Sequence, residues 1–139
     1  MVELPFKIGQ TKTWAKTIGE SDIYIFGGVT GDLCRNHINE QYMQTTPFGK
    51  RIAQGMLVLS MSCLPSTQFA EESPVPCVTL GYDKVRFLQP VFIGDTINIT
   101  YTLEEVDAEK GRTYAKIEIK NQNDQLCVVA THVMKLLLQ

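Results

Sequence analysis

Apolar and polar residues alternate with a period of two in four separate runs of the second half of the chain. This alternation is typical of strands that bury one face. Turn-forming residues separate the runs at Gly94-Asp95 and in the segments 107–111 and 121–124. The pattern therefore predicts four consecutive strands in an antiparallel meander. Their apolar positions are Val78, Leu80, Tyr82, Val85 and Phe87; Ile97, Ile99, Tyr101 and Leu103; Ala115, Ile117 and Ile119; and Cys127, Val129 and Val133.

The first half of the chain has a mixed pattern. Residues 11–18 alternate around Trp14 and predict a strand, whereas residues 21–29 carry apolar side chains at helical spacing and predict a short helix. From Gly31 to Asn39 the chain is rich in Gly, Asp and Asn, which favour a loop because their short polar side chains or free backbone compete with regular structure.

The longest apolar stretch runs from residue 52 to residue 69. Apolar side chains occur almost all round its helical projection, which indicates a helix buried on most sides. Such a helix needs a concave surface to pack on, and strands joined by short turns supply one. The sequence therefore predicts an α+β fold in which a curved antiparallel sheet wraps around one long central helix, with residues 1–139 in a single domain.

Composition narrows the range of partners. With 44% hydrophobic and 20% charged residues the chain is typical of folded globular proteins, and a net charge of −2 gives no basic face for nucleic acid or an anionic membrane. No apolar run reaches the roughly 18 residues of a membrane-spanning helix, and the first ten residues are too polar for a signal peptide, so we expect a cytoplasmic protein. Pairing between copies would cover the edge strands of the predicted sheet, which favours a homodimer or a dimer-based higher homo-oligomer.

Residues that could carry chemistry are few. The histidines are His37 and His132, and His132 lies inside a predicted strand, which indicates a structural role. Asp32 and His37 lie in the predicted loop, where an Asp is also typical of a turn or cap and a His of an exposed surface. Cys34 precedes His37 by three residues, but the four cysteines are widely separated and zinc needs about four ligands. We therefore expect reduced thiols, no metal and no cofactor.

Three segments of the chain together resemble the MaoC-like dehydratases, the R-specific enoyl-CoA hydratases of the hot-dog superfamily. Residues 26–39, FGGVTGDLCRNHIN, are similar to the hydratase motif of that family. Residues 48–57, FGKRIAQGML, resemble its loop and entry into the central helix, and residues 85–95, VRFLQPVFIGD, resemble its strand and turn. The segments occur in the family's order, and the resemblance implies the hot-dog fold already predicted from the pattern.

The resemblance also implies a site. The family's catalytic Asp and the His five residues later match Asp32 and His37, and the backbone amide that holds the thioester oxygen matches Gly55. The implied substrate is a small-molecule acyl-CoA, hydrated as a trans-2-enoyl-CoA to an (R)-3-hydroxyacyl-CoA or formed by the reverse dehydration. Further substrate contacts are expected in the matching segments and on the central helix, from Phe48, Gln54, Met56 and Ser62.

Some positions depart from the family pattern. The family usually has Asn-Pro where this chain has Cys34-Arg35, an aliphatic residue where it has Asn36, and a histidine where it has Gln54. Two other functions stay open at this point: a thioesterase, in which the same amide presents the thioester carbonyl to water, and a non-catalytic acyl-CoA-binding paralogue. The paired Asp32 and His37 favour hydration, because adding water across the double bond needs both a base and an acid.

Overall fold

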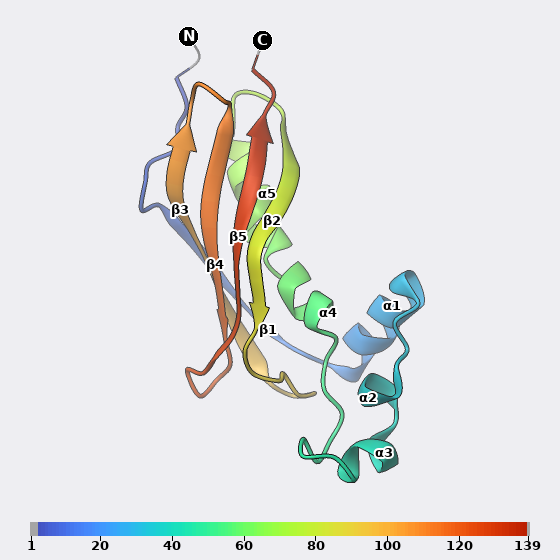
Figure 1. Cartoon of the computed structure of the whole chain (residues 1–139). Coiled ribbons are helices and arrows are strands. Elements are labelled where there is room, and N and C mark those ends of the chain that lie inside the picture. The colour runs from blue at the N-terminus through green and yellow to red at the C-terminus, as the bar shows by residue number, and fades with distance from the viewer. Residues whose placement is uncertain (1–2, 139) are drawn as a thin grey trace.

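The computed structural model describes residues 3–138, which form one antiparallel sheet with helices on one side (Figure 1). The two described ends of the chain lie together at one end of the sheet, away from α1–α3 (Figure 1). The strands are β1 (Thr11–Thr17), β2 (Cys77–Phe87), β3 (Thr96–Asp107), β4 (Arg112–Lys120) and β5 (Leu126–Leu136), in the spatial order β1-β3-β4-β5-β2. The helices are α1 (Glu20–Thr30), α2 (Arg35–Ile38), α3 (Glu40–Gln44), α4 (Gly55–Ser60) and α5 (Cys63–Glu72).

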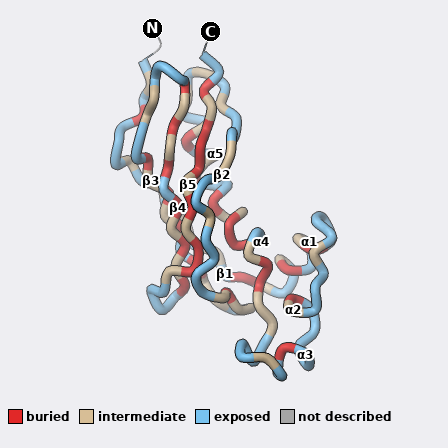
Figure 2. The backbone as a smooth tube through the Cα atoms, in the orientation of Figure 1, coloured by how far each residue is buried: buried red, intermediate tan, exposed pale blue. Residues whose placement is uncertain are grey.

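The predicted alternation is confirmed in β3 and β4, whose buried residues form the centre of the core. Ile99 pairs with Ile119 and Tyr101 with Ile117, and residues directly opposite each other share a face of the sheet. The core face continues into β5 through Val128, which pairs with Ile119. Figure 2 shows the buried positions following these strands and the first turns of the central helix.

The order of the strands differs from the predicted meander. Strands β3, β4 and β5 follow one another as expected, but β2 pairs with β5 and forms the far edge of the sheet. Two register shifts, between Thr79 and Gly81 and between Asp83 and Arg86, change which side of β2 faces the helix. Val78 and Leu80 are consequently about half exposed instead of buried.

The phase of β5 also differs from the prediction. The sequence indicated Cys127, Val129 and Val133 as inward positions. Cys127 belongs to the core cluster, but beyond the register shift between Ile119 and Lys120 the pairing with β4 places Val128 and the even-numbered residues after it on the core face. Cys127 and Val133 are buried as well, so apolar residues occur on both faces of this strand. A strand that is apolar on both faces has no period of two from which the inward face can be read.

The central helix is interrupted, where the sequence predicted one continuous helix over residues 52–69. Residues before Gly55 are extended, and Ile52 forms an isolated bridge with Phe92. Between α4 and α5 the side chains of Ser60 and Ser62 donate hydrogen bonds back to main-chain carbonyls of α4, at 2.6 and 2.7 Å, which is a known cause of helix bending. The Trp14 indole donates to the freed Met61 carbonyl at 2.7 Å.

Helices α1, α2 and α3 form an arm (residues 20–44) that projects beyond the sheet next to the start of α4 (Figure 1). Most of this arm is exposed (Figure 2). Arg51 ties it to the body, since its guanidinium donates to Glu20 at 2.7 Å, Tyr24 at 3.0 Å and Glu40 at 3.2 Å. The hydrogen bond from Arg51 lowers the pKa of Glu20 and, in return, raises the pKa of Arg51. Within residues 3–138, no helix has the length and apolar character to cross a bilayer.

Candidate active site

Asp32 follows directly after α1. The helix ends at Gly31, whose φ of 80° is the left-handed conformation that glycine adopts without strain. The Gly31 amide donates to the Gly27 carbonyl at 2.8 Å, and the Asp32 amide donates to the Thr30 hydroxyl at 3.2 Å. The chain therefore turns sharply at the end of α1 and presents the partly exposed Asp32 carboxylate beside α2.

His37 lies on α2, where the sequence predicted only loop from Gly31 to Asn39. Its side chain is 8% exposed, and its Nε2 lies 3.6 Å from Oδ2 of Asp32. Its Nδ1 lies 2.8 Å from the Ile52 carbonyl oxygen. Because a carbonyl can only accept, Nδ1 carries a hydrogen and Nε2 is the nitrogen left to exchange a proton beside Asp32.

The extended segment 52–54, which leads into α4, holds Asp32 and His37 in place through hydrogen bonds. The Ile52 amide donates to the Asn36 carbonyl at 3.1 Å while the Ile52 carbonyl accepts from His37. The next amide, of Ala53, donates to the Val91 carbonyl at 2.7 Å, which ties the segment to the body of the protein. The Gln54 side chain donates hydrogen bonds to the Ile23 and Asp32 carbonyls on the arm. The orientation of the imidazole is thus fixed by main-chain atoms and does not depend on a flexible side chain.

A cavity of about 460 Å³ opens beside the Asp32 and His37 side chains. Its polar side chains are those of Asp32, Asn36, His37 and Gln89. Its apolar wall consists of Phe48, Ile52, Ala53, Met56, Val58, Phe87, Leu88, Pro90, Val91 and Val128. A volume of this size and an apolar wall with a few polar groups at one place are typical of small-molecule sites.

Gly55 lines the same cavity at the first residue of α4. A Cβ built on Gly55 would lie 2.9 Å from the Phe87 ring, which is closer than carbon atoms approach without a shift. The glycine therefore lets the aromatic ring pack against the backbone here. As the first helical residue, Gly55 has an N–H with no acceptor inside the helix.

Five of the seven predicted site residues are brought together. Asp32, His37, Gly55, Met56 and Phe48 line the cavity, with Met56 and Phe48 at its exposed margin.

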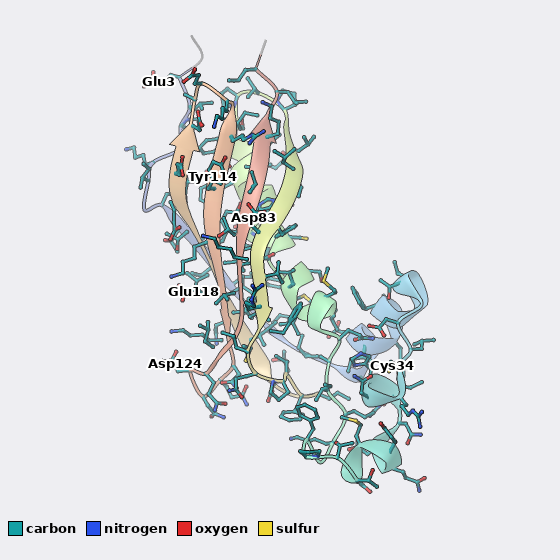
Figure 3. The ribbon with its side chains drawn as sticks, in the orientation of Figure 1. Glu3, Cys34, Asp83, Tyr114, Glu118 and Asp124 are labelled. Atoms are coloured by element: carbon teal, nitrogen blue, oxygen red, sulfur yellow. The ribbon has the colours of Figure 1, made fainter. Side chains whose placement is uncertain are left out.

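Gln54 and Ser62, which were also predicted as substrate contacts, do not line the cavity. Ser62 is buried in the bend between α4 and α5 and donates to Leu59. Gln54 is fully buried behind the site. Cys34 is exposed on the arm (Figure 3) and is not part of the cavity wall.

Sequence reasoning missed several lining residues. Asn36 was noted only as a departure from the family pattern, yet it lines the cavity next to His37, and its buried Oδ1 has no hydrogen-bond partner among residues 3–138. Phe87, Leu88 and Gln89 lie in the segment 85–95 that the resemblance had singled out, so their signal was present. Val128 had no such signal in the sequence, because only the pairing of β4 with β5 places it on the core face.

The described residues 3–138 contain no group of three or more His, Cys, Asp or Glu side chains arranged to hold a metal ion. The polar groups of the cavity are one carboxylate, one imidazole and two amides. They suit proton transfer and hydrogen bonding to a substrate that is otherwise apolar.

A curved sheet wrapped around a central helix, with an Asp and a His at one end of that helix, defines a hot-dog protein of the hydratase type. The chain belongs to the MaoC-like domain family, whose model matches residues 6–125. It is 41% identical over 104 residues to an (R)-specific enoyl-CoA hydratase from Rhodospirillum rubrum, a match that covers 75% of this chain and 70% of the relative.

Two further similarities agree. A 3-hydroxybutyryl-CoA dehydratase from Methylorubrum extorquens is 31% identical over 106 residues, covering 76% of this chain and 66% of the relative. The solved structure of an (R)-hydratase from A. caviae superposes with a TM-score of 0.86 at 24% identity, covering 95% of this chain and 98% of that one, and confirms the predicted fold.

Proposed function

We propose that this protein is a lyase that hydrates a trans-2-enoyl-CoA to an (R)-3-hydroxyacyl-CoA, or catalyses the reverse dehydration. The observation that carries the proposal is the approach of His37 Nε2 to Asp32 Oδ2 at 3.6 Å on the wall of an apolar cavity. The stereochemistry and the CoA thioester come from relatives that are hydratases and dehydratases of CoA esters. The Asp-His pair can supply the base and the acid that this chemistry requires.

In the proposed reaction one water molecule lies between the Asp32 carboxylate and His37 Nε2. Its oxygen adds to C3 of the enoyl group, and the proton it loses passes to one of these two side chains. A proton then reaches C2, either from the same group in a concerted transfer or from the other group in a separate step. General acid-base catalysis by such positioned groups contributes on the order of 10²–10⁴-fold.

The thioester oxygen gains negative charge as the water adds, and the Gly55 amide is the proposed donor to it. Gly55 lines the cavity, and as the first residue of α4 it has an N–H with no acceptor inside the helix. Helix α4 has only six residues, so the local N–H contributes more than any helix dipole. Loss of one such donor costs roughly 3 kcal/mol of transition-state stabilisation. The acyl chain would extend along the apolar wall toward Val58 and Val128.

One assay tests the function and separates it from the alternatives. The protein is incubated with crotonyl-CoA while absorbance of the conjugated enoyl thioester and release of free thiol are followed together. Hydration predicts loss of absorbance without thiol. Thiol release would show a thioesterase instead, and neither signal with retained crotonyl-CoA binding would show a binding protein; both results would overturn the proposal.

The exposed edge strand β2 supports the further proposal that the protein is a homodimer. β2 ends the sheet and carries Val78 and Leu80 about half exposed, an arrangement that pairing between two copies would cover. Light scattering is expected to give twice the 15.6 kDa chain mass. Leu80→Arg is expected to shift the mass to that of one chain, whereas Val29→Arg, at an exposed valine on α1, is the matched control. A wild-type mass of one chain at assay concentrations would contradict the dimer.

A further inference from the structure

Gln54 connects the helical arm to the segment that leads into α4. Its side chain is fully buried, although it is polar and does not line the cavity. Its Nε2 donates to the Ile23 carbonyl at 2.9 Å and to the Asp32 carbonyl at 3.2 Å. One amide group thus holds the main chain of Asp32 against the first half of α1.

The main chain at Asp32 has little other support from the body of the protein. Its amide hydrogen bond goes to Thr30, which lies on the same arm. The neighbouring Leu33 is about half exposed, and Gly31 has the left-handed conformation that permits the turn. His37, in contrast, is held directly by Ile52. The distance between the two catalytic groups therefore depends on how firmly Asp32 is joined to the segment of residues 52–54.

We propose that Gln54 is a positioning residue that sets the Asp32 carboxylate beside His37 Nε2. The inference rests on the proposed function, since it assigns Gln54 a role only if Asp32 takes part in catalysis. Gln54 acts through the Asp32 main chain and touches neither water nor substrate. Its effect is therefore expected on turnover and not on substrate affinity.

The other end of the same amide makes no comparable contact. Oε1 of Gln54 is buried and accepts no hydrogen bond from the described residues. A buried acceptor without a partner lowers stability, whereas the two bonds from Nε2 keep the carbonyls of Ile23 and Asp32 paired. The bonds that join Asp32 to the segment before α4 therefore account for an amide at this position.

Two variants test the proposal in the crotonyl-CoA assay. Gln54→Met keeps the length of the side chain and removes both donors, so kcat is expected to fall about 10²-fold, as for a misplaced catalytic group, with KM close to wild type and the protein still folded at the assay temperature. Gln54→His keeps one ring N–H within reach of the same carbonyls and is expected to recover most of the lost kcat. Wild-type kcat in Gln54→Met would overturn the proposal, as would a loss of Tm that accounts for the lost activity in both variants.

A double-mutant cycle adds a result that a structural role cannot give. If Gln54 acts through Asp32, adding Gln54→Met to Asp32→Asn produces no further loss of kcat. Losses that multiply would overturn the positioning role. Failure of the proposed function is distinguishable, because it would appear as absence of hydration in the wild type or as full activity of Asp32→Asn, whatever the Gln54 variants do.

Discussion

Asp32→Asn and His37→Gln are each expected to lower kcat for enoyl-CoA hydration by about 10²–10⁴-fold, the range for loss of a general acid or base. Asn cannot take a proton from water, and Gln cannot exchange one at the position of Nε2. Because both groups act on one water, the double variant is expected to be little slower than either single variant. The rate of loss of the conjugated absorbance of crotonyl-CoA measures each effect.

The fold should survive both substitutions. Asp32 is partly exposed, and its side-chain partner in the described part of the chain is His37, so its replacement leaves no buried charge unpaired. Asp124→Asn is the matched control, since Asp124 is an exposed carboxylate in the turn between β4 and β5 (Figure 3), removed from the cavity wall, and is expected to keep the wild-type rate. Near-native rates in both Asp32→Asn and His37→Gln would show that the catalytic site has been assigned to the wrong residues.

Acid is expected to destabilise the fold through His132, the histidine that the proposed reaction does not use. Its side chain is 1% exposed, with Nδ1 2.6 Å from the Tyr101 hydroxyl and Nε2 3.0 Å from the Thr79 hydroxyl. Tyr82 stacks on the ring at 4.7 Å. Burial lowers the pKa of His132 to about 4, and burial raises the pKa values of Tyr82 and Tyr101, so both tyrosines stay neutral in acid.

The direction of the effect follows from which state binds the proton. In the unfolded chain His132 takes up a proton below its ordinary pKa of about 6.5, whereas the folded protein keeps the ring neutral until about pH 4. The free energy of unfolding is therefore almost unaffected by this group at about pH 7.5 and falls by about 3 kcal/mol as the pH is lowered from there to about 4.

Urea unfolding at several pH values between 7.5 and 4 measures this dependence. His132→Gln is the comparison variant, because an amide offers a donor and an acceptor to Tyr101 and Thr79 but does not titrate. The variant is expected to lose about 3 kcal/mol less than the wild type over this range, whatever its stability at pH 7.5. Equal losses in the two proteins would show that His132 titrates alike in the folded and unfolded states.

Much of the fold could be predicted from residues whose pattern of apolar and polar positions is compatible with a single type of structure. Ile97, Ile99, Tyr101 and Leu103 alternate with polar neighbours, so only a strand with one buried face satisfies them, and β3 confirms this. The pattern failed where several arrangements satisfy it. The apolar run over residues 52–69 is compatible with one helix, whereas in the structure the Met61 carbonyl at the bend is paired with Trp14, from a strand distant in sequence.

The candidate site likewise contains residues that the sequence could predict and contacts that only the folded chain shows. Asp32 and His37 were predicted because they fall within a run of residues that resembles a family motif. Gln54 belongs to a matching segment too, but a motif gives no direction for a side chain. Only the folded chain shows that Gln54 points away from the cavity and toward the Asp32 carbonyl.

The sequence by itself determined the strands with one buried face and the turns between them, because each depends on local spacing along the chain, and the resemblance to a family motif predicted Asp32 and His37 as the pair that moves a proton. The tertiary structure decided the edge position of β2, the inward face of β5, the cavity wall at Val128 and the contacts of Gln54. Those features depend on which distant segments pair, and many pairings satisfy the same pattern of apolar and polar residues.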